Sequence, residues 1–119
     1  MKQMAEANLS QTVFDRGIAL SRVGGDAELL KEIAILFLED YPKSLSELHE
    51  AVEAKDAKRL ERTAHGLKGS VSNFGARPAV AAAMELETMG REQKLAEVEQ
   101  VLRTLELALA ALKPELESL

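Results

Sequence analysis

Residues 56–76, DAKRLERTAHGLKGSVSNFGA, contain a complete helix together with the signals that begin and end it. Asp56 is a good N-cap, because its carboxylate can accept a hydrogen bond from the free backbone N–H groups of the first turn. Gly75 is a good stop signal, because glycine tolerates the left-handed conformation that often follows a last turn. Apolar residues between them recur at three- and four-residue steps and predict one buried face: Leu60, Ala64, Leu67, Val71 and Phe74.

The opposite face of this helix carries a histidine in an unusual setting. At about 100° per residue, His65 lies away from the apolar stripe, so we expect its imidazole to be accessible to solvent. Lys68 and Gly69 follow at the positions that share a face with it. A glycine inside a helix costs about 1 kcal/mol relative to alanine, and Gly69 faces away from the predicted core. We interpret Gly69 as clearance for another protein's active site, and Lys68 as a charge that can stabilise a phosphoryl group on the ring.

Helical signals continue on the N-terminal side of this segment. Asp15 can cap a short lead helix that ends at Gly24–Gly25, and Asp26 can cap a long helix that runs to about Ala54. The apolar residues of the long helix form one stripe: Leu30, Ile33, Phe37, Tyr41, Leu45, Leu48 and Val52. This register survives across Pro42, so we expect a kink there rather than a helix end.

Two more helices are predicted on the C-terminal side. Pro78 suits the first turn of a helix that ends at Gly90, and its core candidates are Val80, Ala83 and Leu86. The last helix has a strict apolar seam: Leu95, Val98, Leu102, Leu105, Leu109, Leu112, Leu116 and Leu119. Such a seam is typical of a coiled coil and also of a long bundle helix. Pro114 is expected to bend or fray its final turns.

Four long amphipathic helices joined by short turns predict an all-α fold, an antiparallel four-helix bundle with a short additional N-terminal helix. Aromatic residues make up only 3% of the chain, which favours helices over sheets. A chain of 119 residues has room for one core, so we expect a single domain over residues 1–119, with about 1–10 as a loose tail.

Composition excludes several classes of function. The formal net charge is -5 and the basic residues are scattered, which argues against nucleic acid as a partner. The chain has no cysteine, so disulfides and thiolate chemistry are excluded. Its longest strongly apolar run, residues 33–38, is far shorter than a membrane span, and the first residues do not resemble a signal peptide. We therefore expect a cytoplasmic protein without membrane insertion.

The run AHGLKGS at residues 64–70 resembles the H-x-L-K-G-S signature of histidine-containing phosphotransfer (HPt) domains. SNFGA at 72–76 is similar to that family's helix end, and GGDAELL at 24–30 and FLEDYP at 37–42 are similar to its opening helices. The resemblance covers roughly residues 14 to 112. It implies that His65 is phosphorylated, that Lys68 stabilises charge and that Gly69 gives clearance. Glu87 falls where some members have a glutamine near the histidine, but a carboxylate would repel a phosphoryl group, so we assign it no role.

The resemblance also implies a function and partners. The chain would be a phosphorelay intermediate that accepts a phosphoryl group on His65 from an aspartyl-phosphate receiver domain and passes it to another receiver domain. Its partners would be response-regulator receiver domains, a hybrid sensor kinase, or both. Neither nucleotide-binding motif, G-x-x-x-x-G-K-[ST] or G-x-G-x-x-G, is present, so we expect a phosphocarrier without ATP-binding kinase activity. We expect no cofactor and no metal on this chain, with any magnesium on the receiver.

The candidate docking surface includes Arg62 and Ser72, which share the face of His65. Ile35 is a further candidate, because it lies on the outward face of the long helix among charged residues. Two interpretations of Ile35 stay open at this point. It packs beneath the lead helix, or it docks a partner, and the resemblance adds weight to docking because receivers of this family dock around the histidine.

Two rival classes are weaker. A di-metal bundle needs Glu-x-x-His twice, but position 46 is Ser46 and position 62 is Arg62, so neither His49 nor His65 has the required partner. We interpret His49 as a surface residue, since it lacks a nearby lysine and glycine like those beside His65. A dimerising interaction module would use the C-terminal leucine seam. This chain has enough helices to close its own bundle, so we expect a monomer.

Overall fold

The computed structural model describes residues 12–119, and the tail expected over residues 1–10 lies outside them. The described residues form five α-helices and no strand: α2 (Arg16–Arg22), α3 (Ala27–Glu53), α4 (Ala57–Ser72), α5 (Arg77–Glu92) and α6 (Val98–Glu117). The predicted all-α class is confirmed, with the short α2 as the additional N-terminal helix.

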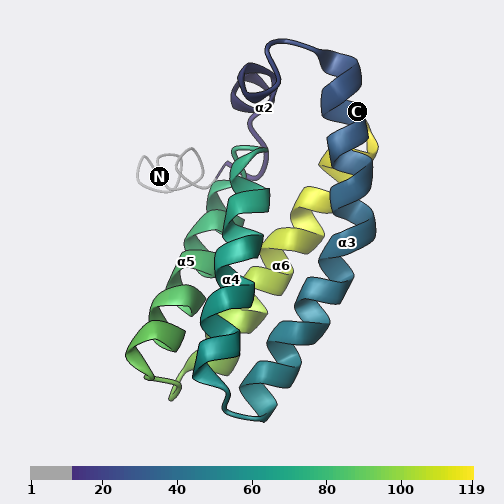
Figure 1. Cartoon of the computed structure of the whole chain (residues 1–119). Helices are drawn as coiled ribbons and strands as arrows, with labels where there is room; N and C mark the ends of the chain where they lie inside the picture. Colours follow the sequence, from purple (N-terminus) through teal and green to yellow (C-terminus); the bar gives the residue numbers. More distant parts are fainter. Residues whose placement is uncertain (1–11) are drawn as a thin grey trace, which may run out of the picture.

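The four long helices form an antiparallel bundle (Figure 1). Each of them packs on two neighbours, because α3 contacts α4 and α6, while α5 contacts the same two helices. The contact between α4 and α5 is the most extensive in the described part of the chain. The edge shared by α4 and α5 is therefore a firmly held place for a functional site.

The predicted N-caps are present in the structure. The side chains of Asp15, Asp26 and Asp56 each accept a hydrogen bond of 3.1 Å from a backbone N–H three residues later. Each capping carboxylate satisfies one of the donors that a helix start leaves free, which fixes where α2, α3 and α4 begin.

The turn between α4 and α5 needs a glycine and holds α2 in place. Gly75 has a φ of 58°, as expected for a helix stop, and a Cβ added to it would lie 2.6 Å from the Cβ of Asp15. The backbone N–H of Asp15 donates to the carbonyl of Phe74 at 2.9 Å, so α2 is tied to this turn. A larger residue at position 75 would therefore strain the turn and separate it from α2.

The core follows the predicted stripes closely. All five apolar residues predicted for α4, from Leu60 to Phe74, are buried, and Leu105, Leu109 and Leu112 of α6 are fully buried. The central leucines of the C-terminal seam are thus used inside the chain's own bundle, which weakens the interpretation of that seam as a dimerising surface. Leu95 is half-buried and lies in the loop before α6.

The prediction that the helix beginning near Pro78 ends at Gly90 is wrong. This helix, α5, continues to Glu92, and Gln93 is the left-handed residue after it, with a φ of 57°. Gly90 is buried instead, and an added Cβ would lie 2.7 Å from the carbonyl oxygen of Ala57 and 2.8 Å from the backbone nitrogen of Glu61. This glycine allows a close approach of two helices, a role that the local sequence alone does not distinguish from a stop.

The two internal prolines do not end their helices. The α3 helix continues through Pro42 to Glu53, as expected from its unbroken apolar register. The α6 helix likewise continues past Pro114 to Glu117. Packing of an apolar face against the bundle therefore outweighs the hydrogen bond that each proline removes.

Candidate functional site

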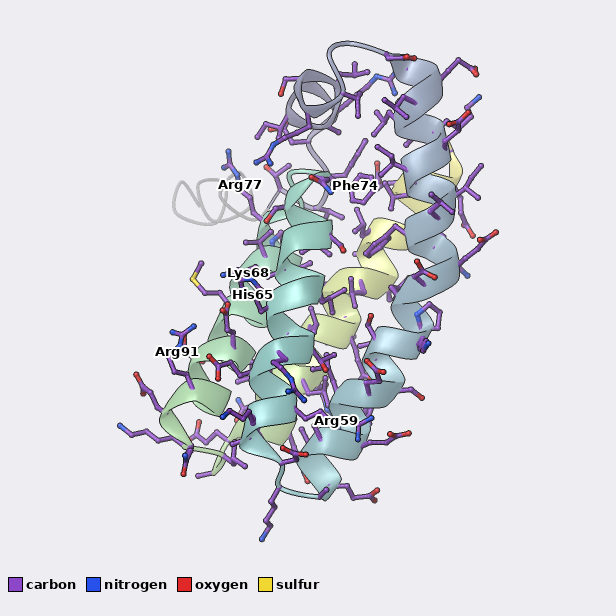
Figure 2. All side chains as sticks on the ribbon, viewed as in Figure 1. Arg59, His65, Lys68, Phe74, Arg77 and Arg91 are labelled. Atoms are coloured by element: carbon purple, nitrogen blue, oxygen red, sulfur yellow. The ribbon has the colours of Figure 1, made fainter. Side chains whose placement is uncertain are left out.

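The imidazole of His65 projects from α4 on the side of α5, as Figure 2 shows. Its side chain is 68% exposed, whereas Ala64 and Leu67 beside it are buried. The predicted accessibility of the ring is confirmed. The exposure follows from the helical register, because the apolar stripe of α4 is turned toward the core and His65 lies off that stripe.

Beside the ring lies Glu87 of α5, which is the one charged residue buried among those the structure describes. Its side chain is only 7% exposed, and its Oε2 atom lies 2.8 Å from Nδ1 of His65. Nζ of Lys68 lies 2.7 Å from the other carboxylate oxygen, and Nη2 of Arg91 lies 3.0 Å from Oε2. Buried carboxylates are stable only when charged or polar partners surround them, and Glu87 has three.

The sequence left Glu87 without a role because a carboxylate would repel a phosphoryl group, but the structure places it in contact with His65. That expectation considered the carboxylate as an isolated negative charge, but in the structure the cationic groups of Lys68 and Arg91 offset it. A signal in the sequence could have found it. Glu87 directly follows the core residue Leu86, which places it at the buried edge of α5, and Arg91 stands four residues later.

The charge on Glu87 determines which ring nitrogen of His65 carries the proton. The hydrogen bond from Lys68, together with the one from His65, holds the pKa of the Glu87 carboxyl below its ordinary value of 4.5, although burial opposes this. At neutral pH the carboxylate is therefore ionised and can only accept hydrogen bonds. Nδ1 of His65 must then carry the proton that it donates to Glu87, and Nε2 of the neutral ring keeps its lone pair.

The other ring nitrogen is free to react. Within residues 12–119, no side chain or backbone group hydrogen bonds to Nε2 of His65. The ring is thus anchored through one nitrogen and open to solvent around it, which is the arrangement that a nucleophilic imidazole requires. A carboxylate that orients a histidine through its other nitrogen is a common feature of sites in which the imidazole acts as nucleophile or base.

Lys68 lies beside the ring, as its spacing from His65 predicts, but its ammonium group is engaged. Its side chain is 26% exposed, and the ammonium forms an ion pair with Glu87. Ser72 donates a 2.7 Å hydrogen bond to the carbonyl of Lys68, which places Ser72 one turn further along the same edge. Lys68 and His65 therefore contact the two oxygens of the same carboxylate.

Gly69 is exposed, and an added Cβ would meet nothing within 4 Å. No contact among residues 12–119 explains a glycine at this position, so we keep the interpretation that Gly69 gives clearance for a partner. Gly66 has the same property, with open space around an added Cβ, and it directly follows His65. The sequence alone did not single out Gly66, because its position adjacent to the histidine does not share a helical face with it.

The predicted docking residues are all at least partly accessible. Ile35 is 50% exposed, which does not favour burial beneath α2, and Arg62 is exposed. Besides Ile35, four large apolar side chains are exposed: Leu29, Leu36, Met84 and Leu107. Two of these line grooves. Leu36 is 59% exposed and lines a shallow groove between α3 and the last turn of α4, and Met84 is 49% exposed in an apolar groove that also includes Ser72.

His49 lies elsewhere in the bundle. Its Nε2 atom lies 2.8 Å from Oε2 of Glu106 on α6, and its side chain is 55% exposed. Neither a lysine nor a glycine of the kind found near His65 accompanies it, in agreement with a surface role. Among residues 12–119, no group of three or more histidine, cysteine or acidic side chains is arranged to hold a metal ion, and no helix there is long and apolar enough to cross a membrane.

Comparison with protein families places the site in context. The model of the Hpt domain family matches residues 32–115, a span that includes His65, Lys68 and Glu87. The chain belongs to the Hpt domain family. As a member of this family it is a histidine phosphotransfer intermediate of phosphorelay signalling, and Hpt domains are phosphocarriers rather than kinases.

A solved structure agrees with this assignment. The chain is similar to histidine-containing phosphotransfer protein B (HptB) from Pseudomonas aeruginosa PAO1, with a TM-score of 0.82 and 27% sequence identity over 88% of this chain and 91% of that one. A comparison with curated protein sequences gave no match. The structural similarity covers the full bundle rather than a single pair of helices, so the Hpt fold is shown for nearly the whole chain.

Proposed function

We propose that Nε2 of His65 accepts a phosphoryl group from the phosphoaspartate of a receiver domain and that a second receiver domain then takes it. The observation that carries this proposal is the hydrogen bond between Nδ1 of His65 and Glu87. It assigns the proton to one nitrogen and the lone pair to the other, in a ring that is 68% exposed. The resemblance of residues 64–70 to the family signature agrees with the same histidine.

The transfer step needs no reactant other than the phosphoaspartate and the His65 ring. Nε2 attacks phosphorus in line with the bond to the aspartyl oxygen, the N–P bond forms, and the electron pair of the broken P–O bond leaves with the aspartate carboxylate. The ring keeps its proton on Nδ1 and becomes positively charged as the bond forms. The carboxylate of Glu87, 2.8 Å away, stabilises that charge, and reversal of the same step delivers the phosphoryl group to the next aspartate.

Neighbouring residues have supporting roles in this proposal. Lys68 moves its ammonium toward the phosphoryl oxygens, whose charge it can offset. Gly66 and Gly69 leave room for the receiver's active site to close over the ring. The exposed apolar side chains of Ile35, Leu36 and Met84 are candidates for burial under the receiver. The receiver's acidic pocket would hold any magnesium, and we expect this chain to bind no ATP.

The proposal is tested by incubating the protein with a panel of receiver domains that carry a radiolabelled phosphoryl group on aspartate. We expect label to move from at least one receiver to this chain, in a linkage that is labile in acid and stable in base, as phosphohistidine is. A linkage stable in acid would indicate phosphoserine, for which Ser70 and Ser72 are the nearest candidates. Failure of every receiver to transfer label would contradict the proposal.

A further inference from the structure

Arg91 occupies a bridging position that the phosphotransfer signature does not explain. Nη2 of Arg91 lies 3.0 Å from Oε2 of Glu87, the same oxygen that accepts from His65, and Nε lies 3.3 Å from Oε2 of Glu61 on α4. The arginine therefore joins the carboxylate under the histidine to the helix that carries the histidine. In Figure 2, Arg91 lies on α5, on the same side of α4 as His65.

The helix packing makes this bridge short. Gly90 is buried against α4, and the site of its missing Cβ is 2.8 Å from the backbone nitrogen of Glu61. The close approach at Gly90 brings α5 against the turn of α4 that precedes His65. Arg91, the next residue, can therefore reach Glu61 and Glu87 at the same time.

Transfer creates a conflict over Lys68. In the structure, the ammonium of Lys68 is paired with Oε1 of Glu87 at 2.7 Å. In the proposed function, the same ammonium is needed by the phosphoryl group on His65. A buried carboxylate that loses a cationic partner is strongly destabilised, so Glu87 would either draw Lys68 back or turn away from the ring. The positive charge on the His65 ring replaces that partner only as the N–P bond forms, so another cation must hold Glu87 while Lys68 moves to the phosphoryl group.

We propose that Arg91 is a positioning residue for phosphoryl transfer, and that it holds Glu87 on Nδ1 of His65 while Lys68 moves to the phosphoryl group. This inference rests on the proposed function and deepens it. Arg91 is suited to this role because its second contact, to Glu61 on α4, holds the guanidinium beside Glu87. Its hydrogen bonds go to Glu61 and Glu87 and not to the ring, so it acts through Glu87.

The effect of Arg91 on the transfer rate should depend on the charge of Glu87, so substitutions at the two positions can be combined to test it. We would measure transfer from the receiver that discharges fastest onto the wild-type protein, using Arg91→Gln, Glu87→Gln and the double variant. Arg91→Gln should lower the maximum transfer rate by roughly fivefold to tenfold, the size of one partly screened hydrogen bond between charged groups. The receiver concentration at half-maximal rate should stay the same. In the Glu87→Gln background, where no carboxylate competes for Lys68, Arg91→Gln should have no effect on the rate.

Two further variants separate positioning from general structural support. Arg91→Lys keeps the cation and should restore most of the rate. Arg59 forms a single ion pair between helices, with its Nη2 2.8 Å from Oε1 of the exposed Glu50, and in Figure 2 it lies on the opposite side of α4 from Arg91. Arg59→Gln should lower the melting temperature less than Arg91→Gln does, because its partner Glu50 is exposed whereas Glu87 is buried, and it should leave the transfer rate unchanged.

Three outcomes would overturn the inference while the proposed function stands. An equal loss of rate in both Glu87 backgrounds would mean that Arg91 attracts the phosphoryl group directly. An unchanged maximum rate in Arg91→Gln would mean that the bridge is only structural. A change confined to the receiver concentration at half-maximal rate would mean that Arg91 contacts the receiver. If instead the wild-type protein accepts no phosphoryl group from any receiver, the proposed function fails, and this inference fails with it.

Discussion

Oε2 of Glu87 lies 2.8 Å from Nδ1 of His65, so a buried carboxylate on one helix determines which nitrogen of an exposed imidazole on the next helix is free. In the proposed function, this relationship makes a surface histidine an oriented nucleophile. It also connects two properties that can be measured separately, the tautomer of His65 and the acid stability of the bundle.

The tautomer depends on an acceptor at position 87. In the wild-type protein, the neutral ring should be protonated on Nδ1, because the Glu87 carboxylate accepts that hydrogen bond. Glu87→Ala removes the acceptor, so both tautomers should be populated and transfer should slow by roughly tenfold, the value of one charge-assisted hydrogen bond. Nitrogen NMR of the histidine ring would report the tautomer, with Arg59→Gln as a control that keeps it. An unchanged tautomer in Glu87→Ala would contradict the proposed role of Glu87.

Acid should weaken the bundle through the same carboxylate. Hydrogen bonds from Lys68 and His65 lower the pKa of Glu87 in the folded protein. A carboxyl with a lowered folded pKa stabilises the fold above its unfolded pKa, near 4.5 here, and loses that contribution as the pH falls through the folded pKa. We expect the free energy of unfolding of wild-type protein, measured with urea, to fall more steeply below pH 4.5 than that of Glu87→Gln. Parallel curves for the two proteins would show that the Glu87 pairing adds no pH-dependent stability.

Two glycines on facing helices should respond in opposite ways to the same substitution. Gly69→Ala should stabilise the fold by up to about 1 kcal/mol, because alanine favours the helix and its Cβ meets nothing within 4 Å. Gly90→Ala should destabilise it by roughly 1–3 kcal/mol, because the new Cβ would press on the backbone of α4 at Ala57 and Glu61. Urea denaturation of both variants would measure the difference.

Substitutions at Gly69 also test whether this position gives clearance for a receiver. A bulkier Gly69→Gln should leave folding intact and slow transfer, while Gly69→Ala transfers closer to the wild-type rate. Equal transfer rates in all three proteins would remove the argument that Gly69 makes room for a receiver.

Docking can be tested at two neighbouring residues that face different directions. Ile35 is 50% exposed on the outward side of α3, whereas Leu36 is 59% exposed and lines the groove beside α4. Replacing either with Asp should change stability by no more than about 0.5 kcal/mol, because both are exposed. A receiver that covers one of them should bind more weakly to that variant and transfer more slowly at sub-saturating concentration. If both variants bind and transfer normally, the receiver lands elsewhere, and the groove at Met84 becomes the next surface to test.

The sequence predicted the fold to a high degree because its strongest signals are local. Asp15, Asp26 and Asp56 are caps whose hydrogen bonds close within three residues, and the apolar stripe of α4 needs only the helical period to be recognised. The exposure of His65 follows from the same helical period, because His65 lies off the apolar stripe of α4. These features require no knowledge of which helices are neighbours.

The unpredicted parts of the site depend on how helices pack. Gly90 has the appearance of a stop signal until α4 is found against it, and Glu87 has the appearance of an unfavourable charge until Lys68 and Arg91 are found around it. Both depend on the α4–α5 contact, which joins residues more than twenty positions apart, such as His65 and Glu87. Local sequence patterns carry little information on contacts of that range.

The central claim, that His65 is the phosphoacceptor, is tested most directly by exchanging each histidine in turn. Labelled phosphoryl transfer from a receiver that charges the wild-type protein should be abolished in His65→Gln and unchanged in His49→Gln, because His49 is held by Glu106 away from the site. Both positions are exposed, so both variants should fold, which circular dichroism would verify. Label retained by His65→Gln and lost from His49→Gln would contradict the account.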